Sequence, residues 1–560
     1  MIRKRKSLVC GILLTSLTGC TASLVPILAP KANGRLFPTG SFFSVYPSEY
    51  TTADWLVEKI ELEKAWEIST GHPEVKVGIV DTGIDASLVE LNGRVNTSLS
   101  YDFVSENSQS ALTYTLPHGT CVASVLGAVA NNSSDFSGIC WDIDLVSYRI
   151  DDHTLTSEHG VVDALIDAIE QAEEDGVPIL CYADGYYYGE ISSTKVSELQ
   201  NAILGYSGLI VCAAGNEAID LDDGITAHTL YPQSFNCPNL LVVGASSSLD
   251  GRPSYSNYGQ DSVDVFAPGN YLRVPSYPLY ENGVCVGYST SFSGTSAAAP
   301  VVAGVAALMK AVNPSLTTSQ IKNKIIQTVA TGFWAFDNEC TSGGRINAYS
   351  ALLSALPTYS LAPQTISCPR TIPAGGHQWY KLLPTNGSFT ISSSGSLDVD
   401  AALYSDPMES PLITANSGGS GSNFSFQYNF DSNSPYYLKV SNSSSAAGSY
   451  SINIVAPHYH DYSHSYTWIN GKKHRAFCSC GAIKLQGHIV APGATLPSTC
   501  LLCGGMATVA FVGGPLSTGI PIYDDLEADF DTIFLTQTEM DEYLSGHIEL
   551  QSVYNSRGNL

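Results

Sequence analysis

Three side chains in separate parts of this sequence are of the types that carry out nucleophilic acyl transfer. Ser296 follows the small residues Gly294 and Thr295 and opens an apolar, alanine-rich segment, 297–309, which predicts a buried helix. A serine at the first turn of a helix faces unpaired backbone N–H groups, which can stabilise an oxyanion. Taken alone, Ser296 is equally well explained as the N-cap of a core helix.

A serine hydroxyl is a weak nucleophile at neutral pH, so it needs a base and a third group that holds the base. Asp81 ends the β-branched run 75–80, which predicts a buried strand, and open α/β sheets carry their chemistry at the carboxyl ends of such strands. His118 opens a second small-residue helix. Each residue has a structural explanation by itself, but the chain order Asp81, His118, Ser296 predicts a catalytic triad.

The segments around these residues resemble the three catalytic blocks of the subtilisin-like (subtilase) serine proteases. The blocks are DTG at 81–83, HGT at 118–120 and GTSAAAP at 294–300. Further segments resemble other blocks of the family in the family's order; they are 213–216, 231–234, 242–245, 254–259, 265–269 and 344–349. The resemblance covers about residues 51–356. It implies an α/β peptidase domain with a subtilisin-like doubly wound parallel sheet, helices on both faces, and a serine endopeptidase activity that requires no cofactor.

The same resemblance assigns the oxyanion hole and the substrate edge. Asn216 corresponds to the asparagine whose side-chain amide donates to the developing oxyanion, with a turn asparagine as the alternative. Ala183, Asp184 and Gly185 correspond to the family's Ser-Leu-Gly edge segment, whose backbone pairs with an extended peptide. We therefore expect a peptide or protein substrate.

Two carboxylates lie where the resemblance places the substrate groove, and one of them departs from the family pattern. Asp184 replaces an apolar residue, and Gly215 and Glu217 flank the oxyanion asparagine near the first specificity pocket. Together the two carboxylates predict a preference for a basic substrate side chain, unless both are simply solvated.

Strands and helices alternate between the histidine and the serine, which is typical of a parallel sheet covered on both faces. The predicted strands are 143–150, 177–182 and 209–214, and helix 160–174 lies between the first two. Residues 54–66 predict an amphipathic helix that leads into the first strand.

The beginning of the sequence predicts export. A basic segment, 3–6, precedes an apolar segment, 7–17, that is too short to anchor the chain across a membrane. Residues 17–20 (LTGC) resemble a bacterial lipobox, which implies a lipid anchor on Cys20 and a cell-surface lipoprotein; an ordinary signal peptide and a secreted protein are the alternative. Residues 21–50 predict a linker or short pro-segment, shorter than the pro-domain of many family members.

Composition limits the remaining functions. The 560-residue chain is long enough for about two to four units. Its net charge of −26 argues against nucleic-acid binding. Seven cysteines of the peptidase region show no tight spacing and are expected to be mostly small buried hydrophobes rather than disulfides; they are Cys121, Cys140, Cys181, Cys212, Cys237, Cys285 and Cys340. Residues 131–135 (NNSSD) resemble a calcium-binding loop of the family, with a polar surface turn as the alternative.

Three further segments follow the peptidase region. Residues 357–456 contain short alternating runs separated by Gly, Ser and Asn turns, which predict a small β-sandwich and resemble the pre-peptidase C-terminal domain. Residues 457–505 form a Cys/His-rich module in which either structural zinc or two disulfides would stabilise the fold. Its paired cysteines are Cys478, Cys480, Cys500 and Cys503. Residues 506–560 form an acidic C-terminal segment.

Two features leave a second function open. The edge segment around Asp184 departs from the family pattern, and residues 21–50 are too short for a full pro-domain. A catalytically weak or inactive subtilase-like surface protein with a binding or adhesive role is therefore the alternative to an active endopeptidase.

Overall fold

The computed structural model describes residues 55–108, 110–112, 117–130, 137–151, 158–281, 284–416 and 423–456, and then separate short strands between residues 466 and 535. The chain divides into two compact units, Met1–Ile454 and Val455–Leu560, which are described separately.

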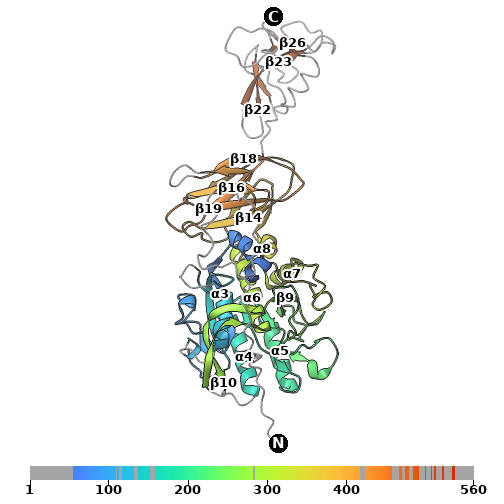
Figure 1. Cartoon of the computed structure of the whole chain (residues 1–560). Helices are drawn as coiled ribbons and strands as arrows, with labels where there is room; N and C mark the ends of the chain where they lie inside the picture. Colours follow the sequence, from blue (N-terminus) through green and yellow to red (C-terminus); the bar gives the residue numbers. More distant parts are fainter. Residues whose placement is uncertain are drawn as a thin grey trace, which may run out of the picture. The chain divides into compact units, whose positions relative to one another are not determined.

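A seven-stranded parallel sheet forms the centre of the first unit (Figure 1). Its strands pair in parallel from one edge to the other. In spatial order they are β2 (Tyr101–Asp102), β3 (Asp142–Arg149), β1 (Gly71–Asp81), β4 (Ile179–Tyr182), β6 (Leu209–Ala213), β8 (Leu240–Ser246) and β9 (Val265–Pro268). Two short antiparallel pairs accompany this sheet: β5 (Tyr186–Tyr187) with β7 (Leu230–Tyr231), and β10 (Leu272–Glu281) with β11 (Val284–Phe292).

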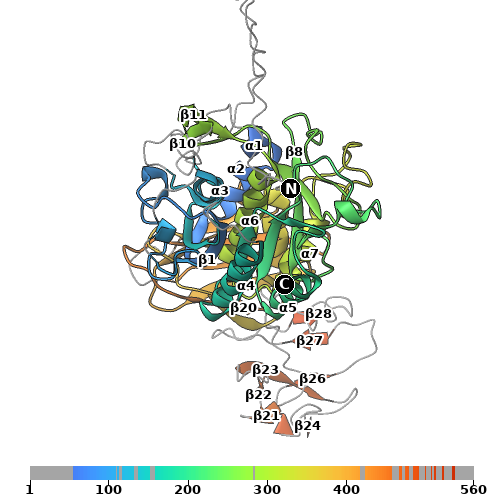
Figure 2. The same cartoon turned by 90° about the horizontal axis from the view of Figure 1, so that it is seen from below.

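Both faces of the sheet are covered by helices. Successive strand residues point to opposite faces, and in β1 Val77 and Ile79 join one core cluster while Val80 joins the other. The first cluster lies under α1 (Trp55–Lys59), α2 (Leu62–Ile68), α3 (Pro117–Gly127), α6 (Thr295–Val312), α7 (Thr318–Gln327) and α8 (Ala348–Ala355). The second lies under α4 (Glu158–Glu174) and α5 (Ser193–Gly205), which lie side by side (Figure 2). The predicted doubly wound parallel sheet is confirmed.

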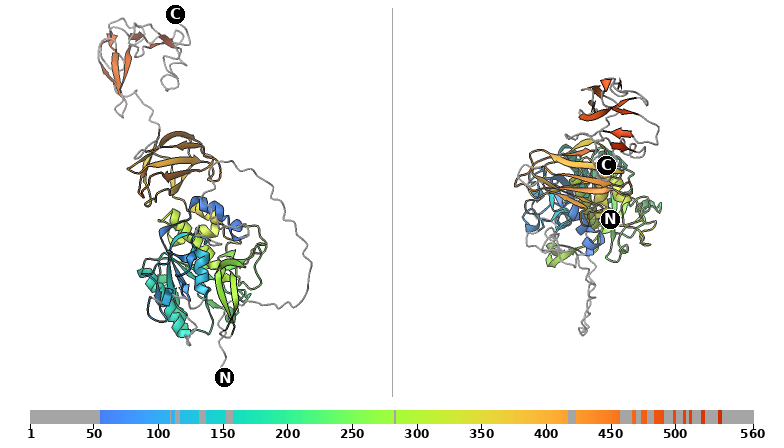
Figure 3. Two further views of the ribbon diagram at one scale, coloured as in Figure 1. Left: turned by 60° about the vertical axis from the view of Figure 1, so that its left-hand side comes forward. Right: turned by 90° about the horizontal axis from the view of Figure 1, so that it is seen from above.

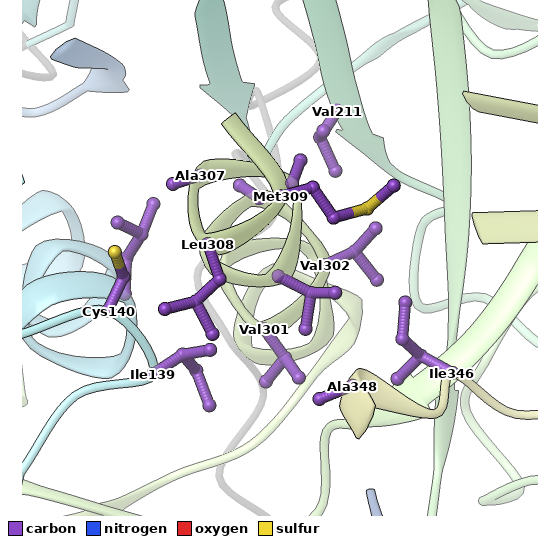
Figure 4. Packing of buried hydrophobic residues seen from close by; sticks show 14 of the residues in the cluster. Ile139, Cys140, Val211, Val301, Val302, Ala307, Leu308, Met309, Ile346 and Ala348 are labelled. Carbon is purple, nitrogen blue, oxygen red and sulfur yellow. The ribbon is translucent and has the colours of Figure 1, made fainter. Parts of the chain in front are cut away.

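Helix α6 runs through the middle of the first core cluster. Its alanines favour a helix and leave little bulk, so neighbouring elements approach it closely. Among the described residues, it is the helix long and apolar enough to cross a membrane, with a mean hydropathy of 1.5, yet 94% of it is buried inside the protein. Figure 4 shows Val301, Val302 and Leu308 of this helix, with Ile139 and Ile346 from other parts of the chain packed beside it.

The predicted helix over residues 54–66 is wrong in one respect, because the structure has two short helices there. Glu61 lies between α1 and α2 in the left-handed conformation, with φ 54°. This turn is supported from the other end of the domain, since Asn347 Nδ2 donates to Glu61 Oε2 at 2.8 Å and Ala348 N donates to Ile60 O at 2.8 Å. Most other predicted elements agree with the structure to within two residues at each end. The exceptions are β1, which begins four residues before the predicted strand 75–80, and α6, which continues three residues beyond the predicted end at residue 309.

Six of the seven cysteines of the peptidase region are free and buried: Cys121, Cys140, Cys181, Cys212, Cys237 and Cys340. For these six, the prediction of small buried hydrophobic residues is confirmed. The side chain of Cys285 lies outside the described part of the chain.

Two β-sheets follow α8 within the same unit (Figure 3). One sheet contains β12 (Thr358–Ser360), β14 (His377–Leu383), β19 (Tyr436–Asn442), β16 (Val399–Tyr404) and β17 (Ile413–Ala415). The other contains β13 (Gln364–Ser367), β20 (Ser451–Val455), β15 (Gly387–Ser394) and β18 (Ser425–Phe430). Residues 358–455, which contain both sheets, make up the β-domain.

The β-domain hydrogen-bonds to the carboxyl ends of two helices. The last carbonyls of a helix have no partner within it. Gln378 Nε2 donates to Val312 O at 3.0 Å in the last turn of α6, and Trp379 Nε1 donates to Glu67 O at 3.2 Å in the last turn of α2. Trp379 also belongs to the core cluster that surrounds α6. The β-domain is thus packed against the helix whose other end carries Ser296.

The second unit is described only as strands. A four-stranded sheet contains β21 (Tyr466–Trp468), β22 (Lys473–Phe477), β23 (Ile483–Val490) and β26 (Ala510–Val512). Two strand pairs accompany it: β24 (Ser498–Thr499) with β25 (Met506–Ala507), and β27 (Ile520–Ile522) with β28 (Ile533–Leu535).

Candidate active site

Asp81 and His118 form a hydrogen-bonded pair at the carboxyl edge of the sheet. Asp81 is the last residue of β1 and is buried, while His118 is the second residue of α3. His118 Nδ1 lies 2.8 Å from Asp81 Oδ1 and 2.9 Å from Oδ2. Thr82 N also donates to Asp81 Oδ1 at 2.7 Å, so the carboxylate is fixed from two directions. A carboxylate at Nδ1 holds the ring in one orientation and leaves Nε2 available for proton transfer.

The close approach of α3 to β1 depends on Gly119. A Cβ atom at this position would lie 2.4 Å from Gly83 O and 3.1 Å from the Asp81 side chain. Gly119 N donates to Thr82 Oγ1 at 3.0 Å, which joins the beginning of the helix to the end of the strand. The glycine in the HGT segment is therefore what allows His118 to lie against Asp81.

Ser296 lies in the first turn of α6 and is buried. Gly294, two residues before Ser296, has φ 132°, in the region that favours glycine. The turn at Gly294 connects the end of β11 at Phe292 to the start of α6. The Phe292 ring packs edge-on against His118, with ring centroids 5.5 Å apart. Among the described residues, the Ser296 hydroxyl donates to Ala183 O at 3.1 Å and makes no hydrogen bond with His118.

Carboxylates set the charge of the His118 ring. Burial disfavours the charged ring, but the Asp81 carboxylate and its hydrogen bond, with Asp184 and Asp151 further away, outweigh burial and raise the pKa of His118. Asp184 is exposed, with its Oδ1 accepting from Gly185 N at 2.8 Å. Loss of solvation by the surrounding protein raises the pKa of the Asp184 carboxyl to about 6, against the opposing effects of that hydrogen bond and of His118.

Asn216 is held beside the nucleophile by its neighbour Thr295. Asn216 Oδ1 accepts from Thr295 N at 2.8 Å and from Thr295 Oγ1 at 3.2 Å. A backbone N–H can only donate, so the oxygen of the amide must face Thr295. Within the described part of the chain, no hydrogen bond occupies Asn216 Nδ2. The amide nitrogen is therefore an available donor close to Ser296.

Gly215 and Glu217, predicted to bind substrate, contribute to the position of Asn216. Gly215 N donates to Thr295 Oγ1 at 3.0 Å. Glu217 Oε2 accepts from Asn216 N at 2.9 Å and from Asn257 Nδ2 at 2.8 Å. Glu217 Oε2 is thus occupied by hydrogen bonds with residues of the site itself.

Asn257 and Gln233 were not singled out by the sequence analysis. Asn257 is fully buried, and its Oδ1 accepts from Glu217 N at 3.0 Å while Nδ2 donates to Ala214 O at 2.9 Å. Gln233 is also buried and donates to Ala213 O at 2.7 Å. Gln233 lies in segment 231–234 and Asn257 in segment 254–259, and both segments resemble blocks of the family. The resemblance therefore pointed to these segments, but it assigned no role to either residue.

The remaining predicted sites lie outside the described residues. These are the lipidation site Cys20, the calcium loop 131–135, and the cysteines Cys478, Cys480, Cys500 and Cys503. Within the part of the chain that the structure describes, no group of three or more His, Cys, Asp or Glu side chains is arranged to hold a metal ion.

A parallel α/β sheet with a carboxylate-held imidazole and a helix-start serine at its carboxyl edge is typical of a serine hydrolase. Residues 72–348 match the family described as "Subtilase family". Thermitase of Thermoactinomyces vulgaris is 30% identical over 298 residues, covering 53% of this chain and 94% of that protein. Subtilisin DY of Bacillus licheniformis is 32% identical over 277 residues, covering 50% of this chain and 91% of that protein. A solved structure of a cold-adapted subtilisin-like serine proteinase is 28% identical, with a TM-score of 0.38, covering 50% of this chain and 89% of that chain.

The chain therefore belongs to the subtilase family of serine endopeptidases.

Proposed function

We propose that this subtilase hydrolyses peptide bonds outside the cytoplasm through an acyl-enzyme formed on Ser296. The Ser296 hydroxyl attacks the scissile carbonyl carbon, and His118 Nε2 takes the hydroxyl proton. Asp81 holds the ring and stabilises its charged form. Asn216 Nδ2 and the backbone N–H groups at the start of α6 bind the oxyanion of the tetrahedral intermediate. His118 then protonates the leaving amine, and a water molecule deprotonated by the same ring releases the acyl group.

The observation that carries this proposal is the contact of His118 Nδ1 with both oxygens of Asp81. Helix α3, which carries His118, packs against α6, which carries the serine. The mechanism requires the Ser296 hydroxyl to exchange its hydrogen bond with Ala183 O for one with the His118 ring. Such bonds are often loose before substrate binds.

The segment Ala183, Asp184 and Gly185 supports the binding of an extended peptide. It leaves the carboxyl end of β4 directly beside Ser296, since the hydroxyl donates to Ala183 O. A peptide that adds its backbone to this segment brings its carbonyls past the nucleophile. The proposed substrate is therefore a protein segment that can adopt an extended conformation.

A binding protein without activity remains the second candidate, since the Ser296 hydroxyl is bonded to Ala183 O rather than to His118. Labelling of the purified full-length chain with a fluorophosphonate separates the two. An active enzyme is labelled, and both Ser296→Ala and His118→Ala abolish the label. A folded chain that is not labelled would favour the binding role.

We also propose that the chain is a cell-surface lipoprotein anchored through Cys20, on the basis of the LTGC segment. Metabolic labelling with a radioactive fatty acid tests this, with Cys20→Ala as the control. Loss of both the label and membrane association in Cys20→Ala supports the anchor, whereas a secreted, unlabelled wild-type chain contradicts it.

Structural calcium at residues 131–135 and structural zinc at Cys478, Cys480, Cys500 and Cys503 are proposed on sequence grounds alone. Metal analysis of the full chain, together with mass spectrometry under non-reducing conditions, distinguishes zinc from disulfides. The β-domain is proposed as a pre-peptidase-like module with a binding or spacer role.

A further inference from the structure

Two chain segments flank the nucleophile and form the walls of the space beside it. β4 and β6 are neighbouring parallel strands, and residues 183–185 and 213–217 lie at their carboxyl ends. Ser296 contacts the first segment, through Ala183 O at 3.1 Å, and its neighbour Thr295 contacts the second, through Asn216 Oδ1 at 2.8 Å. A substrate side chain next to the hydroxyl must enter between these segments.

The side chain of Gln233 bridges the two segments. Its Nε2 donates to Asp184 O at 2.9 Å and to Ala213 O at 2.7 Å, which is one carbonyl from each segment. Gln233 is only 2% exposed. Since both hydrogen bonds come from one planar amide, the side chain is held in a single position.

Close contacts show that little room remains around this bridge. A Cβ atom built on Gly185 would lie 2.7 Å from Gln233 Nε2 and 2.8 Å from Gln233 Oε1. On the opposite segment, a Cβ atom built on Gly215 would lie 2.3 Å from Asn257 Nδ2, 2.8 Å from Glu217 Oε2 and 3.1 Å from Leu230 Cδ2. Leu230 is buried and paired with Tyr187, so its segment is fixed relative to the first one. Gln233, which contacts a carbonyl of each segment, thus occupies space between them.

Covalent geometry brings one substrate side chain into this space. The side chain begins within about 2.5 Å of the attacked carbonyl carbon, because the two are separated by a single Cα atom. With the carbonyl carbon at Ser296 Oγ and its oxygen directed at Asn216 Nδ2, this side chain enters between the two segments toward Gln233.

We propose that Gln233 restricts the residue whose carbonyl is attacked to small side chains such as Gly, Ala and Ser. This inference rests on the proposed function, which supplies the reaction. It differs from the preference for basic side chains predicted from Asp184 and Glu217, because a long basic side chain needs the room that Gln233 fills.

Peptides that differ only at the attacked residue test the proposal with the purified full-length chain. For the wild type, kcat/KM for the Ala peptide should exceed that for the Leu, Phe and Lys peptides by at least about tenfold. Gln233→Ala opens the space and should reduce this ratio by about tenfold. Gln233→Met keeps the length of the side chain without its donors and should preserve the preference for Ala.

The outcomes separate this proposal from the proposed function. Equal cleavage of the Ala and Leu peptides by a wild type labelled at Ser296 overturns only the size restriction, and so does a preference for Lys. A wild type that cleaves no peptide and is not labelled overturns the proposed function and this inference with it. If Gln233→Ala does not fold, the peptide preferences of the wild type and of Gln233→Met still test the proposal. A loss of the preference for the Ala peptide in Gln233→Met contradicts it.

Discussion

The charge of the His118 ring depends on three carboxylates, Asp81, Asp184 and Asp151. Asp81 lies at Nδ1, and Asp184 and Asp151 add negative potential from further away, which raises the pKa of His118 against the effect of burial. The ring must be neutral to accept the serine proton. A raised pKa of His118 therefore moves the acidic limb of the activity profile to higher pH. Asp184 lies outside the triad, but its charge should influence the pH dependence of kcat/KM.

Asp184→Asn should move the acidic limb of the kcat/KM profile to lower pH, by on the order of 0.5 pH unit. The sign follows from the loss of a negative charge that favours the protonated ring. Steady-state rates between pH 4 and pH 9 give the measurement. Glu174→Gln, an exposed change on α4, is the control and should leave the limb in place. A limb that does not move in Asp184→Asn would contradict this account of His118.

Asn216 has two separable roles, since Oδ1 holds Thr295 N and Nδ2 is the available donor. Asn216→Ala should lower kcat by about 10²- to 10³-fold with little change in KM, because the oxyanion exists only after attack. Asn216→Asp keeps an acceptor for Thr295 N but has no donor. A comparable loss of kcat in Asn216→Asp assigns the effect to the donor, whereas near wild-type kcat in either variant argues against this oxyanion contact.

At the scale of secondary structure, the site depends on how closely α3 approaches the end of β1. Gly119→Ala places a methyl group 2.4 Å from Gly83 O, so backbone must move. We expect the free energy of unfolding to fall by about 1–3 kcal/mol. We also expect kcat/KM to fall by about tenfold or more, because His118 is displaced. Gly205→Ala is the matched control, since nothing lies within 4 Å of the added methyl. Denaturant unfolding and kinetics on both variants measure the two effects.

The strands of the central sheet could be predicted because apolar, β-branched runs such as 75–80 have few other stable solutions in a buried sheet. The break between α1 and α2 could not. Glu61 has ordinary helix propensity, and its left-handed conformation depends on Asn347, which is 286 residues away. The triad was predicted from its three blocks, whereas Gln233 and Asn257 act through contacts with distant backbone that no local pattern records.

Across the first unit, the peptidase fold and the β-domain share one hydrophobic core. Trp379, Tyr404 and Tyr437 of the β-domain belong to the cluster that surrounds α6. Tyr349 OH in α8 donates to Asp406 Oδ1 at 3.1 Å, which adds a polar contact at the same boundary. We therefore expect these two parts to unfold together, as one transition by both fluorescence and circular dichroism.

His377 makes this boundary sensitive to acid. Its Nε2 lies 3.2 Å from Glu67 O, and burial, with the nearby Lys439, lowers the pKa of His377 to about 3. In the unfolded chain its pKa is about 6.5, so the unfolded state binds a proton first as pH falls. The stabilising contribution is complete above about pH 6.5 and is lost progressively between that pH and about pH 3.

From pH 7 to pH 5, this group alone should lower the free energy of unfolding by about 1–2 kcal/mol. His377→Gln keeps a donor for Glu67 O and does not titrate, so the variant should lack this part of the decrease. At pH 7, the difference in the free energy of unfolding between wild type and variant measures the effect of packing. The change in this difference from pH 7 to pH 5 measures the effect of protonating His377. An unchanged difference would mean that His377 can take up its proton without leaving the boundary between the β-domain and α2.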